Sequence, residues 1–282
     1  MTVATLPAVG AAVAFLRRHQ RPDGGWGYHL GNRTSFTEPT AWALAALAEH
    51  APPGDPVVER AVAFLLGTRN PDGGWANLPG MPSDMMTARA VFALAGRPEC
   101  EAAVARGVNW LARNELAQGG WGWCHGTTGF VETAAYAAVA FSAAGRLDPA
   151  DRVADYIRGL RCVDGGWCSH VPAKVGYRQS SQASVTPLGV VALSRLGLRP
   201  ESDRDLRTSV DLVTGWVECG AVTTAYSLAL TLWALREVGR PGAAATKAGA
   251  LALARVGDDG GWNGNVLQTA IMCHGLTWLA ST

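Results

Sequence analysis

Three carboxylates stand at the starts of consecutive alanine-rich segments of the sequence. Glu38, Asp84 and Glu132 each lie within three residues before a threonine that opens such a segment. A carboxyl group buried among apolar side chains has a raised pKa and can act as a general acid near neutral pH. A carboxylate in the first turn of a helix can also simply cap backbone amides and complement the helix dipole. We expect Glu38 and Asp84 to be the acid and its positioning partner, with Glu132 or the loop residue His170 as a base.

Large apolar side chains lie close to these carboxylates in the same segments or at their entries. The predicted substrate-binding residues are Trp42, Met85, Trp123, Phe130, Tyr136 and Tyr226, and Phe92 and Trp233 occupy similar places in two of the segments. The face of an aromatic ring attracts a cation, so such residues can hold a carbocation. At helical spacing they also commonly form an ordinary hydrophobic core. Both interpretations stay open from the sequence.

Cysteine and histidine occur together after two neighbouring glycine-rich turns. Cys124 and His125 form one pair, and Cys168 and His170 the other. Such pairs could bind zinc between two loops or form a nucleophile–base dyad. The spacing within each pair is not that of a zinc finger, so we expect polar packing of the loops, no bound metal and no cofactor. His274 falls inside the last apolar segment, where a core histidine is favoured and an inward-facing base is the alternative.

An internal repeat positions all of these residues. The element Asp-Gly-Gly-Trp, with one Gln-Gly-Gly-Trp variant, ends at Trp26, Trp75, Trp121, Trp167 and Trp262. A degenerate copy without its tryptophan lies at Glu218-Cys219-Gly220. Six repeats of about 47 residues therefore fill the 282-residue chain.

Each repeat predicts a pair of helices. An amphipathic helix precedes the glycines, which allow positive φ and end it, and a second helix that is apolar nearly all round begins at the recurring threonine. An open solenoid of such hairpins would need polar terminal repeats, yet the last repeat is as apolar as the others. The sequence therefore predicts an all-α fold, a single (α/α)6 toroid over residues 1–282 with an outer and an inner ring of helices.

The residues Gln20 to Trp26 match the Q-x3-G-x-W repeat of squalene–hopene and oxidosqualene cyclases. The chain also resembles the wider group that includes the β subunits of protein prenyltransferases. In this group the Gln and Trp tie adjacent outer turns together, which implies that the five repeat tryptophans are structural. The resemblance also implies that chemistry takes place at the starts of the inner helices, where the cyclases carry D-x-D-D-T-A.

That cyclase motif is not intact in this sequence. Glu38 falls on the position of its middle aspartate, Asp84 one position before it and Glu132 one position after it. The zinc ligands of the prenyltransferases are missing as well, since Gln268 stands where their histidine precedes the threonine of the last repeat. The resemblance therefore favours a cyclase-like enzyme over a zinc prenyltransferase. The long fourth loop, which begins at His170, is a predicted lid over the inner-helix starts.

Composition excludes several classes of partner. With 24 basic and 23 acidic residues, the net charge of +1 provides no general attraction to nucleic acid. The apolar N-terminal stretch lacks the basic start of a signal peptide, and no apolar run is long enough to span a membrane, so we expect a cytoplasmic protein. Contact with a membrane surface and the oligomeric state are left open.

These observations favour a metal-independent terpenoid or polyene cyclase-like enzyme that uses carboxylate acid–base chemistry on a small apolar substrate inside the ring. Two alternatives remain. One is a non-catalytic toroid that binds a lipid or a peptide, and the other is a Cys/His-dependent enzyme that modifies natural products.

Overall fold

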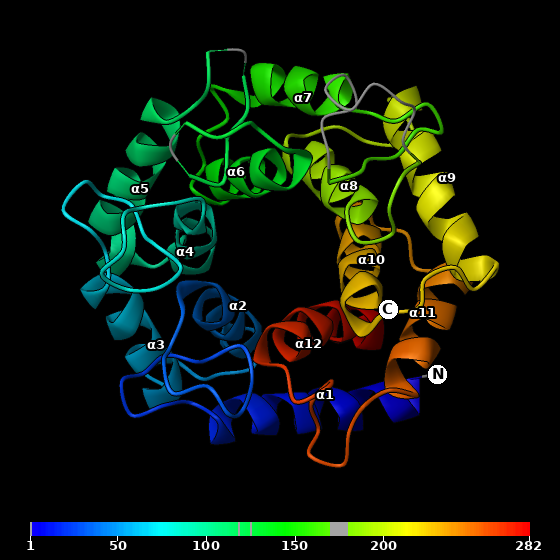
Figure 1. The fold of residues 1–282 in the computed structure, drawn as a ribbon. Coiled ribbons are helices and arrows are strands. Elements are labelled where there is room, and N and C mark those ends of the chain that lie inside the picture. The colour runs from blue at the N-terminus through cyan, green and yellow to red at the C-terminus, as the bar shows by residue number, and fades with distance from the viewer. Residues whose placement is uncertain (1, 118, 125, 170–179) are drawn as a thin grey trace.

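Two concentric rings of helices make up the fold of this chain (Figure 1). The computed structural model describes residues 2–117, 119–124, 126–169 and 180–282, and that part of the chain contains twelve α-helices. The inner helices are α2 (Thr37–Ala48), α4 (Met86–Leu94), α6 (Val131–Ala143), α8 (Thr186–Arg195), α10 (Ala225–Glu237) and α12 (Val266–Ser281). The outer helices are α1 (Thr2–Arg18), α3 (Pro56–Gly67), α5 (Glu101–Arg113), α7 (Ala150–Gly159), α9 (Arg204–Glu218) and α11 (Ala243–Leu253), with a short 3-10 turn, Pro98–Cys100, before α5.

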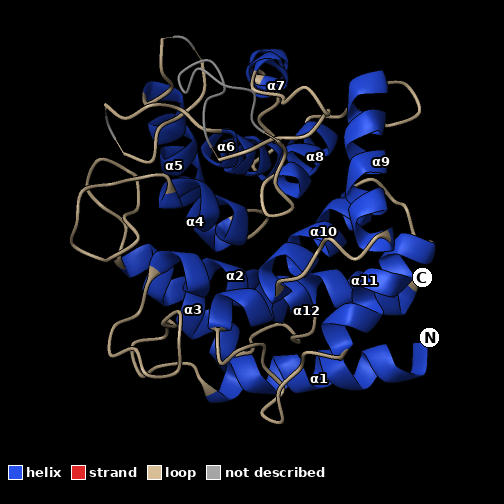
Figure 2. Ribbon diagram, turned by 45° about the vertical axis from the view of Figure 1, so that its right-hand side comes forward, coloured by secondary structure: helices blue, strands red, loops and turns tan. Residues whose placement is uncertain are grey.

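The inner ring is closed. Each inner helix packs against the next, from α2 through α12, and α12 packs in turn against α2. The first outer helix, α1, lies along α12, so the two ends of the chain complete the same hairpin (Figures 1 and 2). The predicted all-helical (α/α)6 toroid is confirmed.

The inner helices are buried on almost every side because alanine allows close approach of neighbouring helices. In α6, for example, ten of the thirteen residues are buried, and five of these ten are alanine. The outer helices instead alternate buried and exposed residues, as in α5, where Trp110 and Leu111 face inward and Arg113 lies at the exposed end. The ring is therefore held by apolar contact between its two layers.

The repeat tryptophans pin five of the six outer helices, all except α9, to the inner helices that follow them. In all five Gly-Gly-Trp turns the indole Nε1 donates to a backbone carbonyl ten residues earlier, at 2.6–2.9 Å. In four of them the backbone amide of the tryptophan donates to the threonine hydroxyl of the next inner helix, at 2.8–3.0 Å. In the third turn the hydroxyl of Thr133 donates to the carbonyl of Trp121. The tryptophans and threonines of the repeat thus belong to the scaffold.

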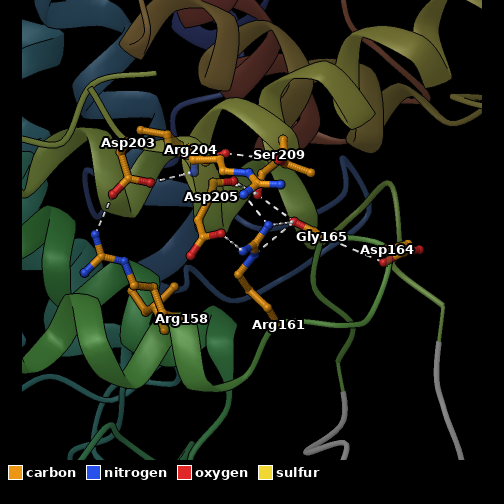
Figure 3. Close-up of polar contacts among 12 residues, drawn as sticks. Arg158, Arg161, Asp164, Gly165, Asp203, Arg204, Asp205 and Ser209 are labelled. Atoms are coloured by element: carbon orange, nitrogen blue, oxygen red, sulfur yellow. Dashed lines mark hydrogen bonds and ion pairs between the residues drawn. The ribbon is translucent and has the colours of Figure 1, made fainter. Parts of the chain in front are cut away.

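A side chain four residues before the first glycine ties neighbouring outer helices together. In the first repeat Gln20 donates from Nε2 to the carbonyls of Gly24, at 3.0 Å, and Val57, at 2.7 Å. In the fourth repeat Arg161 takes this place and donates to the carbonyls of Gly165 and Asp205 at 3.1–3.2 Å (Figure 3). The resemblance implied a glutamine tie, and the structure shows that an arginine can replace it.

Backbone hydrogen bonds in the loops also connect adjacent repeats. The backbone amides of Thr37, Met85 and Val266 donate to the carbonyl two residues after the tryptophan of the following repeat, at 2.8–3.1 Å. For Val266, in the last repeat, that carbonyl belongs to Tyr28 of the first. The starts of three inner helices, α2, α4 and α12, are therefore each linked to the loop of the next repeat.

No helix within the described residues combines the length and the apolar character that crossing a bilayer requires.

Candidate active site

Glu38 lies at the mouth of the ring, in the first turn of α2. Its Oε1 accepts a hydrogen bond from Nε of Arg89 at 3.2 Å, and its Oε2 accepts one from the hydroxyl of Tyr28 at 2.7 Å. The Tyr28 hydroxyl in turn accepts a bond from Nδ2 of Asn77 at 2.8 Å. The side chains of Glu38 and Arg89 are only 14% and 3% exposed, so this is a largely buried ion pair. The first two repeats contribute to it, with Tyr28 and Glu38 from the first and Asn77 and Arg89 from the second.

Arg89 extends from α4 across the mouth. Its guanidinium carbon lies 3.5 Å from the ring centroid of Tyr136 and 5.5 Å from that of Trp123. Burial alone would lower the pKa of Arg89, but the charge of Glu38 and the nearby hydroxyls of Tyr136, Tyr226 and Tyr28 together raise it by more, so the net shift is upward. Arg89 is therefore a permanent positive charge that packs on aromatic faces.

Asp84 lies at the same mouth, just before α4. Its carboxylate accepts hydrogen bonds from the backbone amides of Met86, at 2.7 Å, and Asn77, at 3.1 Å. Burial raises the pKa of Asp84, and the negative charge of Glu38 adds to that rise, although the two backbone hydrogen bonds and Arg89 act in the opposite direction. The net shift is upward, so Asp84 is easier to protonate than an exposed aspartate.

Below the carboxylates, aromatic side chains meet across the ring. Trp42 lies 4.8 Å from Trp233 and 5.4 Å from Phe92, measured between ring centroids. Phe92 and Tyr136 lie 6.3 Å and 6.2 Å from Trp233. These four residues come from α2, α4, α6 and α10, and we call them the aromatic cluster. Because α4 and α10 stand on opposite sides of the inner ring, the cluster spans its axis (Figure 1).

The aromatic cluster is dry and nearly closed to solvent. Trp42, Tyr136 and Trp233 are at most 2% exposed. Burial raises the pKa of Tyr136 to about 12, even though the charge of Arg89 acts to lower it. Nε1 of Trp42 and the hydroxyl of Tyr136 are themselves buried. The cluster is therefore a buried set of aromatic rings that meet at the axis.

The remaining predicted residues are spread around the same mouth. Met85 is buried and lines a cavity of about 160 Å³ together with Trp121 and Cys124. Phe130 and Tyr226 are half-buried, at the entry to α6 and in the first turn of α10, and Glu132 occupies the first turn of α6. Trp123 is 41% exposed and contacts Arg89. His170 lies outside the described residues.

The Cys/His pairs are only partly visible in the described chain. Cys124 is exposed and Cys168 is buried, whereas His125 and His170 lie outside the described residues. In the described part of the chain no three His, Cys, Asp or Glu side chains are grouped as metal ligands.

Sequence reasoning missed Arg89, Tyr28 and Asn77, which complete the site. A signal for Arg89 was present, because it is the only charged residue within the apolar stretch 85–95. An arginine in a helix that is otherwise buried needs a buried partner, and Glu38 of the neighbouring helix is that partner. Tyr28 and Asn77 share the position two residues after a repeat tryptophan, which is the loop position that bridges adjacent repeats.

A closed (α/α)6 ring with carboxylates at the starts of its inner helices, above a buried aromatic cluster, is the architecture of class II terpenoid cyclases. Residues 2–88 match the family model of the squalene-hopene cyclase C-terminal domain. The chain is 31% identical over 219 residues to drimenyl diphosphate synthase from Streptomyces showdoensis, which covers 69% of this chain and 40% of that protein. The chain thus spans less than half the length of this relative. The predicted resemblance to squalene–hopene cyclase-like terpenoid cyclases is confirmed.

Solved structures confirm the fold over almost the whole chain. A variant of the type II terpene cyclase MstE from Scytonema, in complex with its substrate geranylgeranyl dihydroxybenzoate, superposes with a TM-score of 0.74 at 16% identity, covering 99% of this chain and 98% of that one. An alpha-amylase from Clostridium perfringens superposes with a TM-score of 0.67 at 8% identity, covering 96% and 97%. The same ring therefore supports unrelated chemistries, and function has to be argued from the site.

Proposed function

We propose that this chain is a class II terpenoid cyclase-type enzyme that protonates an alkene of a prenylated substrate and guides the resulting carbocation through cyclisation. The observation that carries the proposal is Asp84, a half-buried carboxyl group whose pKa is raised by burial. It lies at the mouth of a ring whose axis is lined by aromatic faces. The sequence similarity to drimenyl diphosphate synthase supports a polyprenyl diphosphate as substrate, and the fold of MstE supports a prenylated aromatic acid as the second candidate.

Two carboxyl groups at this mouth have different environments and therefore different roles. Glu38 is held by the positive charge of Arg89 and by the Tyr28 hydroxyl, so it serves as a fixed negative charge. Burial and that charge raise the pKa of Asp84, so its protonated form is more accessible than that of an exposed aspartate. Asp84 is thus the proposed acid and Glu38 its positioning partner, and Glu132 or His170 is the base that the sequence predicts.

The aromatic cluster supplies the other half of the chemistry. A carbocation gains from the negative faces of aromatic rings when water is excluded. Trp42, Trp233 and Tyr136 are buried deeply enough to provide this. Protonation by a carboxyl group and stabilisation by ring faces need no metal ion, so we propose that the reaction is metal-independent.

Turnover by the full chain tests the proposal. Farnesyl diphosphate, geranylgeranyl diphosphate and geranylgeranyl dihydroxybenzoate are incubated with the purified protein in EDTA, and products are identified by gas or liquid chromatography with mass spectrometry. We expect a cyclic isomer of at least one substrate. Asp84→Asn should lower the rate by about 10²–10⁴-fold, because it removes the proton donor and keeps the side-chain shape.

Matched variants separate the proposed mechanism from other readings. Asp148→Asn removes an exposed carboxylate that accepts hydrogen bonds from Arg146, and it should leave the rate unchanged. Full activity of Asp84→Asn would refute the proposed acid. Tight binding of a substrate without turnover would instead favour the lipid-binding toroid, and activity lost with Cys124→Ser or Cys168→Ser would favour the Cys/His-dependent enzyme.

A further inference from the structure

At the far side of the aromatic cluster from Asp84, a histidine lies buried against the ring axis. His274 sits in the middle of α12, is 5% exposed, and contacts Trp42 and Trp233 edge-on, with ring centroids 6.0 Å and 6.3 Å apart. Its Nε2 is buried and has no hydrogen-bond partner among the residues that the structure describes. A buried polar atom that faces aromatic rings and lacks a partner needs an explanation.

The other ring nitrogen of His274 is firmly held. Nδ1 lies against Oε1 of Glu49, the residue that follows α2. Nη1 of Arg236, in α10, donates to both oxygens of that carboxylate at 3.1 Å. The same nitrogen also donates to the backbone carbonyl of His274 at 2.8 Å. Burial alone would raise the pKa of Glu49, but the hydrogen bonds from His274 and Arg236 lower it to about 2. Glu49 is therefore an anion that orients the imidazole.

This arrangement sets the tautomer of His274. Nδ1 lies against Glu49, which can only accept, and 3.2 Å from Nη1 of Arg236, which can only donate. Because the contact with Glu49 is the shorter, we assign the proton to Nδ1. In the neutral imidazole Nε2 then carries a lone pair, on a ring that packs against Trp42 and Trp233. The arrangement matches the way in which a carboxylate orients a general base.

We propose that His274 is the catalytic base that ends the cyclisation, with Glu49 and Arg236 as its positioning residues. This proposal rests on the proposed function. Asp84 would protonate an alkene at one end of the substrate, and the positive charge would move along the chain as new C–C bonds form. Nε2 of His274 would then take a proton from the carbon next to the final cationic centre, and the C–H electron pair would become a C=C bond. Glu49 would balance the charge of the imidazolium until the proton returns to solvent.

Product analysis tests the base. His274→Asn keeps an N–H group near the place of Nδ1 and removes Nε2, and Glu49→Gln removes the orienting charge. Both variants should still consume substrate, since Asp84 is untouched, but the share of the native alkene product should fall about tenfold or more in His274→Asn, with alcohols and less cyclised products in its place. His50→Gln, next to Glu49 in sequence, is the control and should leave the product ratio unchanged.

The outcomes separate this proposal from the proposed function. Unchanged product ratios in an active His274→Asn variant would overturn the base, whereas wild-type protein that consumes no substrate would overturn the function itself. Nitrogen-15 NMR of histidine-labelled wild-type protein gives an answer that does not depend on turnover. A proton on Nδ1 and a free Nε2 at neutral pH support the proposal. A proton on Nε2, whether in the neutral Nε2–H tautomer or in the imidazolium, contradicts it. If His274→Asn does not fold, the product ratio of Glu49→Gln decides, with a shift toward alcohols supporting the base and an unchanged ratio refuting it.

Discussion

Charged groups at both ends of the inner ring are paired across helices rather than within them. Glu38 of α2 pairs with Arg89 of α4 at the mouth, and Glu49 pairs with Arg236 of α10 and His274 of α12 at the other end. Removing either carboxylate leaves a buried partner, Arg89 or His274, without compensation. These residues therefore combine structural and chemical roles.

For Glu49, the contribution of its charge to the free energy of unfolding depends on pH. Its pKa falls from 4.5 to about 2 in the folded chain, so the stability that its charge contributes is complete above about pH 4.5 and disappears as the pH falls toward 2. We expect Glu49→Gln to lower the free energy of unfolding by about 2 kcal/mol at pH 6, with this difference shrinking between pH 4.5 and 2. Urea denaturation at several pH values measures it.

An exposed pair provides the comparison for Glu49. Asp211 is 61% exposed and pairs with Arg240, so Asp211→Asn should change the free energy of unfolding by less than about 0.5 kcal/mol at either pH. A Glu49→Gln effect that stays constant from pH 6 to pH 2 would show that packing, and not charge, is lost.

The sequence predicted part of this site and missed the rest for a physical reason. Glu38 and Asp84 were found because the repeat places them before a helix start, and Trp42 and Tyr136 because they are large and periodic. Arg89, Glu49 and Arg236 act through partners on other helices, and only the closed ring brings those partners together. His274 could be predicted to lie in a buried helix, but the direction of its two nitrogens could not.

Helices in this fold depend on the turn between them more than on their own propensity. The five Gly-Gly-Trp turns were predicted from the sequence, and so was the structural role of their tryptophans. The sequence did not show that Arg161 replaces the repeat glutamine, because a charged side chain at an exposed turn looks like ordinary surface. Its place opposite Asp205 and beside Gly165 explains the substitution (Figure 3).

The bonds of Arg161 between two outer helices are expected to stabilise the fold. Arg161→Ala removes hydrogen bonds to the carbonyls of Gly165 and Asp205 and should lower the free energy of unfolding by about 1–3 kcal/mol. Arg161→Gln should recover much of that loss, because Gln20 makes the equivalent pair of bonds in the first repeat. Urea denaturation of both variants checks this, and equal losses in the two would contradict the equivalence. Arg146→Ala, at a 52% exposed arginine, is the control.

Closure of the ring depends on contact between the first and the last helix of the chain. Phe15 and Leu16 of α1 are fully buried, and the carbonyl of Leu16 accepts the indole hydrogen bond of Trp26. The predicted closed toroid follows from the apolar last repeat, yet the sequence alone did not show which outer helix would cover it. α1 covers α12, with the N- and C-termini close together (Figure 1).

Deletion of residues 1–18 should therefore destabilise the whole ring and not only remove one helix from it. We expect the shortened chain to lose its sharp thermal transition in circular dichroism and to associate in gel filtration, since the apolar face of α12 becomes exposed. A circular permutant is the matched control, with residues 1–18 joined after Thr282 by a flexible Gly/Ser linker, and it should unfold cooperatively. A cooperative, monomeric deletion variant would refute the role of α1.

The contact between α1 and α12 also joins the first and the last helix to be synthesised. Synthesis proceeds at roughly 5–20 residues per second, so α1 leaves the ribosome on the order of tens of seconds before α12 exists. Throughout that interval Phe15 and Leu16 lack their final neighbour, and the nascent chain can stack hairpins without being able to close them. The ring can therefore be completed only once α12 has been synthesised, and until then the growing chain presents the apolar face of α1 to chaperones.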